Sequence, residues 1–136
     1  MNENIPRGIR NNNPGNIRYN PNNRWVGLSP CQNDKDFCVF IEPKYGIRAL
    51  SIILRNYQSR YGLKTVKDII NRYAPTIENN TNSYVKSVCQ FLGITDTTII
   101  DIGEGCVMLC LLKAIIRHEN GIQPYSNEEL LEGIRA

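Results

Sequence analysis

The stretch that decides the fold is residues 106–118, Cys-Val-Met-Leu-Cys-Leu-Leu-Lys-Ala-Ile-Ile-Arg-His, because almost every position in it is apolar. Gly121 follows shortly after and is a residue type that commonly ends a helix. A helix that is apolar on nearly all sides is normally buried at the centre of a fold. We therefore expect a mainly α structure, with a helical bundle around one buried central helix.

Further helices are expected around the central one, because apolar residues recur at the helical period in four other segments. These segments are residues 45–61, 66–73, 80–92 and 127–134. Thr65 is the predicted N-cap of the second segment, with Asp68 three positions later, and Pro75 stops that helix. Residues 80–83 can cap the third segment, and Gly93 ends it.

Residues 1–34 lack a helical period and are rich in Asn, Pro and Gly, the residues of turns. Apolar anchors such as Ile17 and Trp25 interrupt them, so we expect a long ordered loop region rather than a disordered tail. Residues 37–41, Phe-Cys-Val-Phe-Ile, are typical of a strand. With residues 17–26 they are expected to form a small β-hairpin or a pair of short strands.

The composition places the chain among single-domain globular proteins, and we expect one domain over residues 1–136. No apolar run reaches the roughly 18 residues of a membrane span, and the polar N-terminus does not resemble a signal peptide. The net charge of +3 is too weak to favour a nucleic-acid partner, but it suits a mildly anionic one such as a bacterial cell wall. No heptad pattern favours an oligomer, so we expect a monomer.

The chain has five cysteines and one histidine, His118, without a C-x-x-C pair, so we expect no metal and no cofactor. Cys31 and Cys38 bracket a short polar loop and could form a disulfide in an oxidising compartment.

The first candidate for chemistry is Glu119, at the end of the apolar helix. A carboxyl group against apolar walls is desolvated, which favours its protonated form. That form is what a glycosidase needs to donate a proton to a glycosidic oxygen. The alternative is a solvent-facing residue of the last helical turn.

Two other features are candidates for the same site. Glu78 lies in a loop between helices, where catalytic groups collect, although it could also be a capping carboxylate. The loop of residues 11–18 offers amide groups, and Trp25 offers an aromatic face, a combination that suits sugars. The alternative is a set of turns held by local hydrogen bonds, and both interpretations can hold for different asparagines.

Much of the chain resembles a family of phage and prophage virion structural proteins. The resemblance rests on Arg7 to Arg18, Trp25-Val26-Gly27, Phe37, Phe40, Tyr45 to Ala49, Arg72 to Pro75, Glu78 to Thr81, Tyr84, Leu92-Gly93 and His118 to Gly121.

A second resemblance is to the glucosaminidase/muramidase branch of the lysozyme-like superfamily. There, an apolar helix ends in a catalytic Glu and precedes an Asn-rich segment, a Trp-x-Gly and a late Tyr-Ala segment. Residues 13–18, 25–27 and 73–75 are similar to the later parts in that order, whereas the Glu-bearing helix, residues 114–121, stands last. This order is the one that a circular permutation would give. Glu119 is followed by Asn rather than Ser, and the family's Thr-Asp after Tyr-Ala is absent.

This resemblance implies a lysozyme-like fold and an enzyme that cleaves peptidoglycan glycan strands, a muramidase or a lytic transglycosylase. Glu119 would be the general acid, with Glu78 and Tyr73 completing the catalytic set. Carboxyl groups about 5–5.5 Å apart would indicate a retaining route, and about 6.5–9.5 Å an inverting one. The expected substrate contacts are Asn12, Asn13, Asn16, Arg18, Trp25 and His118.

Two other functions stay open at this point. One is a non-catalytic virion or secretion-apparatus protein that binds glycan or other proteins. The other is a cysteine peptidase or amidase with His118 as base, which would need Cys31, Cys38 or Cys89 within hydrogen-bond reach. A wall-degrading enzyme without a signal peptide would reach the periplasm by non-classical delivery, in a virion or through a lysis or secretion system.

Overall fold

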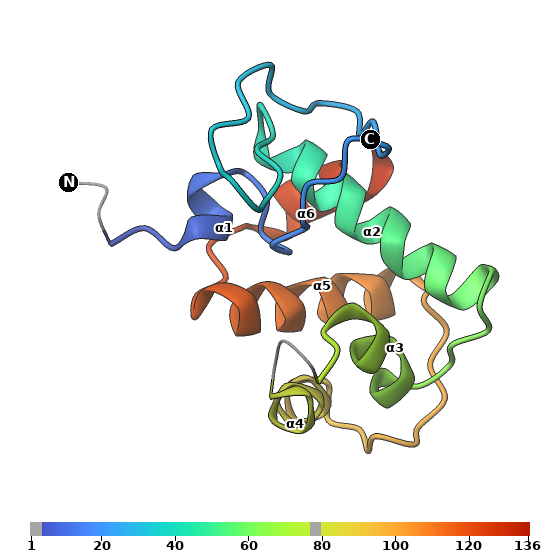
Figure 1. Ribbon diagram of the computed structural model, residues 1–136. Helices are drawn as coiled ribbons and strands as arrows, with labels where there is room; N and C mark the ends of the chain where they lie inside the picture. The colour runs from blue at the N-terminus through green and yellow to red at the C-terminus, as the bar shows by residue number, and fades with distance from the viewer. Residues whose placement is uncertain (1–3, 77–79) are drawn as a thin grey trace.

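A computed structural model describes residues 4–76 and 80–136 of the chain. Six helices account for most of the regular structure in these residues (Figure 1). They are α1 (Arg7–Arg10), α2 (Pro43–Ser59), α3 (Val66–Tyr73), α4 (Thr81–Leu92), α5 (Gly105–Asn120) and α6 (Asn127–Arg135). The expected mainly α class is confirmed, with the addition of the short helix α1 inside the predicted loop region.

Helix α5 runs through the middle of the molecule (Figure 1). The pair α2 and α6 covers one side of it, and α4 packs on the other side with α3 against α4. Six of the α5 side chains are buried, but Cys106 is exposed and Cys110 is half-buried. The central position is therefore as expected, whereas the helix is buried along one broad face rather than all round.

The helix ends follow the local signals of the sequence. The Thr65 side chain accepts a hydrogen bond from the Asp68 backbone, as the predicted N-cap requires. Asn80 caps α4 in the same way, and Gly93 ends it in the left-handed conformation. Because each signal lies within a few residues of the boundary that it sets, these boundaries were accessible from sequence.

The expected β-hairpin is wrong in its regularity: among the described residues, residues 17–40 form only isolated antiparallel bridges, Arg18 with Phe37 and Leu28 with Phe40. Side-chain amides occupy the places of a strand ladder. Gln32 bonds to both backbone groups of Val39, at 2.7 and 2.9 Å. Asn13 donates to the carbonyl oxygens of Ile17 and Cys38. The loop is thus ordered by side-chain amides together with scattered backbone hydrogen bonds rather than by regular paired strands.

Cys31 and Cys38, the two cysteines that could form a disulfide in an oxidising compartment, are both free in this structure. Cys31 is exposed, whereas Cys38 is buried and its Sγ lies 3.7 Å from the carbonyl oxygen of Arg18. Burial raises the pKa of the Cys38 thiol to about 11. In the described part of the chain, no helix has the length and hydrophobicity to cross a membrane.

Candidate functional site

A pocket of about 330 Å³ opens where the N-terminal loop region meets helices α2, α3 and α5. Its wall combines apolar and aromatic side chains with a few polar groups, as ligand-binding pockets commonly do. The lining residues are Gly15, Asn16, Ile17, Arg18, Phe37, Ile53, Tyr57, Tyr73, Ala74 and Glu119. Glu119 is the one carboxylate among these described lining residues.

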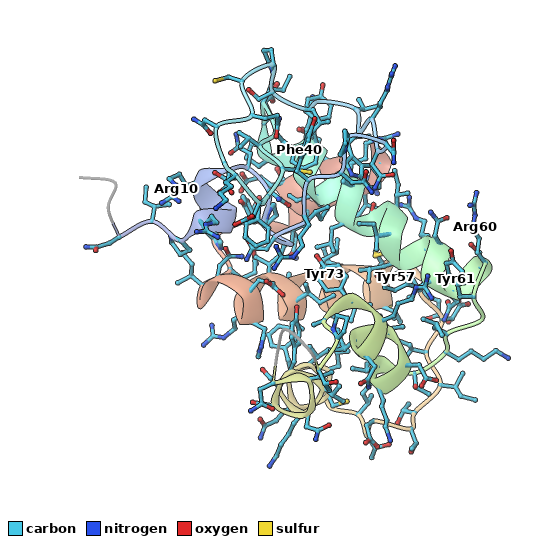
Figure 2. All side chains as sticks on the ribbon, in the orientation of Figure 1. Arg10, Phe40, Tyr57, Arg60, Tyr61 and Tyr73 are labelled. Atoms are coloured by element: carbon cyan, nitrogen blue, oxygen red, sulfur yellow. The ribbon has the colours of Figure 1, made fainter. Side chains whose placement is uncertain are left out.

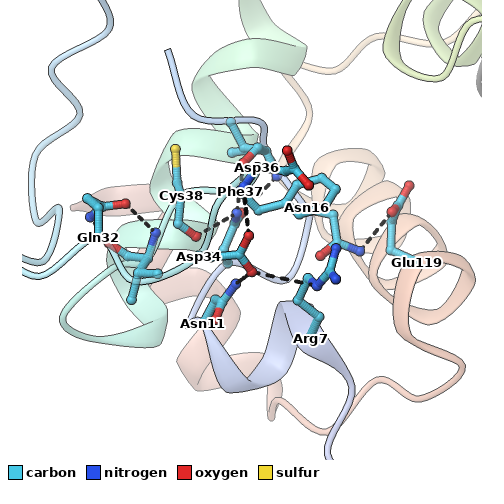
Figure 3. Close-up of polar contacts among 12 residues, drawn as sticks. Arg7, Asn11, Asn16, Gln32, Asp34, Asp36, Phe37, Cys38 and Glu119 are labelled. Carbon is cyan, nitrogen blue, oxygen red and sulfur yellow. Dashed lines mark hydrogen bonds and ion pairs between the residues drawn. The ribbon is translucent and has the colours of Figure 1, made fainter. Parts of the chain in front are cut away.

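Glu119 lies in the last turn of α5 and holds two hydrogen bonds through its carboxyl group. Asn16 Nδ2 donates to Oε1 at 3.0 Å, a contact drawn in Figure 3, and the Tyr84 hydroxyl donates to Oε2 at 2.8 Å. The side chain is only partly buried, so one side of the carboxyl remains accessible from the pocket. The two donors, one from the N-terminal loop region and one from α4, fix the orientation of the carboxyl group.

Asn16 reaches Glu119 because the loop before it is tightly ordered. Its backbone has a positive φ of 51°, a conformation that asparagine tolerates better than most residues. Asn13, which is fully buried, holds this turn by accepting from the Ile17 N–H at 3.0 Å. Local asparagine chemistry therefore determines where the Asn16 amide points.

Two tyrosines complete the surroundings of Glu119. The Tyr73 hydroxyl donates to the Gly15 carbonyl oxygen, and its ring lines the pocket. Burial, reinforced by the negative charge of Glu119, raises the pKa of Tyr73 well above its usual value. The same two causes raise the pKa of Tyr84. Both phenols are therefore neutral hydrogen-bond donors throughout the physiological range.

His118 lies beside the acid on the outer side of this group. Its ring stacks on Tyr84 with the centroids 3.8 Å apart. Burial lowers the pKa of His118, and the Glu119 charge opposes that shift. No thiol in the described part of the chain has a hydrogen bond to His118, so nothing there supports the cysteine peptidase or amidase alternative.

Gly8 in α1 lies where several oxygens converge behind the site. A Cβ at this position would lie 2.4 Å from Asn120 Oδ1, 2.8 Å from Asn16 Oδ1 and 2.9 Å from the Asn13 carbonyl oxygen. The two amide oxygens are buried and have no hydrogen-bond partner among the described residues. Only a residue without a side chain fits here, and the amides of Asn16 and Asn120 are packed against its bare backbone.

The structure brings Glu119, Asn16, Arg18 and Tyr73 to one pocket, as the sequence interpretation required. Glu78 lies outside the described residues. His118 is next to the acid, but it is not among the pocket-lining residues.

Three more of the expected substrate contacts are not among the residues that line the pocket. Asn13 is fully buried and saturated by backbone partners, and Asn12 donates to the Phe40 carbonyl oxygen at 3.0 Å. Trp25 packs against the core and does not line the pocket. The contacts of these residues agree with the turn and packing interpretation.

Sequence reasoning missed Tyr84, Phe37 and Tyr57 as site residues. Tyr84 was counted as one apolar position of a helix, and its hydroxyl contact with a residue 35 positions away has no local signal. Phe37 was assigned to a strand, but it lines the pocket with the Arg18 and Arg7 guanidinium groups 4.9 and 5.1 Å from its ring centroid. Tyr57 lies one turn beyond Ile53 on the α2 face that reaches the pocket.

No protein-family model matches the chain. The chain is 36% identical over 129 residues to Protein P5 of Pseudoalteromonas phage PM2, an alignment that covers 93% of this chain and 79% of that protein. The expected kinship with phage proteins is confirmed, whereas the lysozyme-like assignment and a place in a virion stay predictions. The chain belongs to the same family as Protein P5 of Pseudoalteromonas phage PM2.

Proposed function

We propose that this protein cleaves the glycan strands of peptidoglycan, with Glu119 as general acid. The observation that carries the proposal is a single carboxyl group in a pocket of amides and aromatic rings, held by two neutral donors. Neutral sugars have hydroxyl edges and apolar C–H faces, which match this mixture. A positioned carboxylic acid is the group that protonates the leaving oxygen in glycoside cleavage.

The Asn16 amide offers a way to hold the acid in its protonated state. Its Nδ2 donates to Glu119, which suits an ionised carboxylate. A half-turn of the amide would present Oδ1 to Glu119, where it would accept the proton of a carboxylic acid. The same half-turn would place Nδ2 on the Gly8 side, where Asn120 Oδ1 lacks a donor. Both protonation states of Glu119 therefore have a matching orientation of Asn16.

The course of the reaction depends on what attacks the sugar cation. Glu119 is the one carboxylate among the described lining residues, so the substrate's own C6 hydroxyl is a candidate nucleophile, as in lytic transglycosylases. Glu119 would first protonate the leaving oxygen and then accept the proton of that hydroxyl. Tyr73 would be a neutral dipole beside the developing charge. Glu78, if it faces Glu119, would instead allow hydrolysis through water or a covalent intermediate.

A second candidate, compatible with a phage relative, is a virion component that binds glycan without cleaving it. Delivery inside a particle would also bring a wall-degrading enzyme to the periplasm, so the two candidates differ only in catalysis. A binding protein would not depend on the proton of Glu119.

The experiment is a turbidity assay on purified Gram-negative peptidoglycan, with soluble products weighed by mass spectrometry. Glu119→Gln should lower the rate by about 10²–10⁴-fold, the usual contribution of a general acid. Glu104→Gln is the matched control, because Glu104 is exposed at the opposite end of α5 and makes no capping hydrogen bond. It should leave the rate unchanged. Anhydro products would indicate transglycosylation, and no release by the folded wild type would reject catalysis in favour of binding.

A further inference from the structure

One end of the pocket continues onto a cluster that the cleavage chemistry does not use, formed by Tyr57, Tyr61 and Arg72. Tyr57 lines the pocket from α2, and Tyr61 follows four positions later, just beyond the end of that helix. Arg72 comes from α3 and lies over both rings, 5.4 Å from the Tyr57 centroid and 3.8 Å from that of Tyr61. Figure 2 shows Tyr73, Tyr57 and Tyr61 side by side in that spatial order, with Tyr61 outermost.

This cluster is open to solvent at its outer end. Tyr61 is 53% exposed, and Arg72 is exposed as well. Burial raises the pKa of Tyr57, and the positive charge of Arg72 opposes that rise. The inner ring is therefore part of the pocket wall, whereas the outer ring and the guanidinium group form an accessible surface.

The charge of Arg72 has no acidic partner in residues 4–76 and 80–136, where the one ion pair joins Arg7 to Asp34. Arg72 donates a hydrogen bond to the Tyr57 hydroxyl. A guanidinium group has five N–H donors, so others remain that match the two oxygens of a carboxylate. The tyrosine faces beside it suit the apolar face of a sugar. The cluster thus offers a cation and an aromatic platform at the edge of a proposed glycan site.

We infer that Tyr57, Tyr61 and Arg72 form a subsite for an acidic sugar unit, in which Arg72 binds a carboxylate carried by the glycan. The inference rests on the proposed function for its glycan, and it adds that the protein selects acidic glycans over neutral ones. Two carboxylates can supply this chemistry in peptidoglycan: the lactyl carboxylate of muramic acid in strands without peptides, and the carboxylates of the peptide stem in intact strands.

The test is calorimetric binding of three soluble oligosaccharides to the full chain carrying Glu119→Gln, which prevents turnover. The ligands are a tetrasaccharide of peptidoglycan with its stems, the same tetrasaccharide after the stems are removed by an amidase, and the neutral tetramer of N-acetylglucosamine. Adding Arg72→Gln should raise the Kd of the acidic ligands by about tenfold and leave that of the neutral tetramer within twofold. Loss confined to one acidic ligand identifies which carboxylate is bound.

Two further variants separate recognition from general effects. Arg72→Lys keeps the charge but not the planar fork, so it should weaken acidic binding nearly as much as Arg72→Gln. Arg135→Gln removes the same charge from α6, where Arg135 is exposed, and should change no Kd by more than twofold. An equal effect of Arg135→Gln would mean that only net charge matters and would overturn the subsite.

The remaining outcomes also decide whether the acidic-sugar subsite is kept or rejected. Equal loss for neutral and acidic ligands, unchanged binding of all three, or no binding of any would overturn the inference. Tighter and more Arg72-dependent binding of a thymidine oligonucleotide would assign the cluster to nucleic acid and overturn it too. Because binding is measured without turnover, Arg72-dependent acidic binding without wall cleavage would reject the proposed catalysis alone, and cleavage without Arg72-dependent binding would reject the subsite alone.

Discussion

Replacing Gly8 by alanine tests whether the amides around Glu119 are packed as tightly as the structure indicates. The new Cβ would lie 2.4 Å from Asn120 Oδ1 and 2.9 Å from the Asn13 carbonyl oxygen. Asn120 cannot move freely, because its Nδ2 donates to the carbonyl oxygens of Pro14 and Ile116 at 2.8 and 2.9 Å. The Asn13 carbonyl belongs to the backbone of the ordered loop. Relief of the clash must therefore break hydrogen bonds or shift α1.

The expected cost follows from two opposing contributions. Overpacking of a tight site costs about 2–3 kcal/mol, and alanine in a helix regains about 0.5–1 kcal/mol relative to glycine. The net loss in the free energy of unfolding is about 2 kcal/mol. With an unfolding entropy of about 2.1 cal/mol/K for each residue, the Tm of this 136-residue chain should fall by roughly 7 °C.

The assay is thermal unfolding followed by circular dichroism, with Gly105→Ala as the matched control. Gly105 begins α5 and has no atom within 4 Å of its added Cβ, so the same change should raise the Tm by about 2 °C. The two variants should thus move the Tm in opposite directions. A Gly8→Ala protein that melts at or above the wild-type temperature would refute the packing argument for this site.

Two other changes test contacts of the site and of the loop that supports it. Tyr84→Phe removes the donor to Glu119 Oε2 and keeps the ring against His118. We expect the free energy of unfolding, measured with urea at pH 7, to fall by about 1–2 kcal/mol. An unchanged midpoint would mean that this bond contributes nothing to stability. Asp34 is half-buried, which opposes its ionisation, but its surroundings lower its pKa from 3.8. They do so through hydrogen bonds from the Asp36 backbone, the Asn11 amide and the Phe37 backbone, and through the charge of Arg7. Its ionised form therefore stabilises the fold above pH 3.8, and this contribution is lost as the pH falls through the lower folded pKa. Asp34→Asn should be less stable than wild type at pH 6 and should approach it below pH 3.8, whereas a deficit that stays constant with pH would contradict the linkage.

The fold was largely predictable where its determinants are local. The cap at Thr65, the stop at Pro75 and the left-handed end at Gly93 each depend on residues next to the boundary. The hairpin was wrongly predicted as regular, because the period of residues 37–41 indicates a strand whereas the side-chain amides of Gln32 and Asn13 bond to several of its backbone groups. Helix α1 is a single turn without a side-chain cap, too short for any period to reveal.

The site was predictable only in part, because only some of its residues have a local signal in the sequence. Glu119 and Asn16 stand in segments whose composition indicates chemistry, and they are 103 residues apart yet in contact. Their meeting was accessible only through the resemblance to a permuted lysozyme-like order. Tyr84 and Arg72 lie on amphipathic helices, where a hydroxyl or a guanidinium at the edge of the apolar face has no distinguishing pattern. Which partner such a group finds is decided by the packing of whole helices.

The origin of the site in distant segments links its geometry to the stability of the whole domain. Glu119 comes from α5, and its two donors come from the N-terminal loop and from α4. The Tyr73 hydroxyl, from α3, donates to the Gly15 carbonyl oxygen in that loop. These groups come from four separate segments of the chain, so they cannot keep their relative positions if the helices separate. The Asn120 amide, bonded to Pro14, fixes the end of α5 to the same loop that carries Asn16. Substitutions that loosen this junction should therefore disturb the acid before they unfold the protein, because the acid depends on all of these contacts at once.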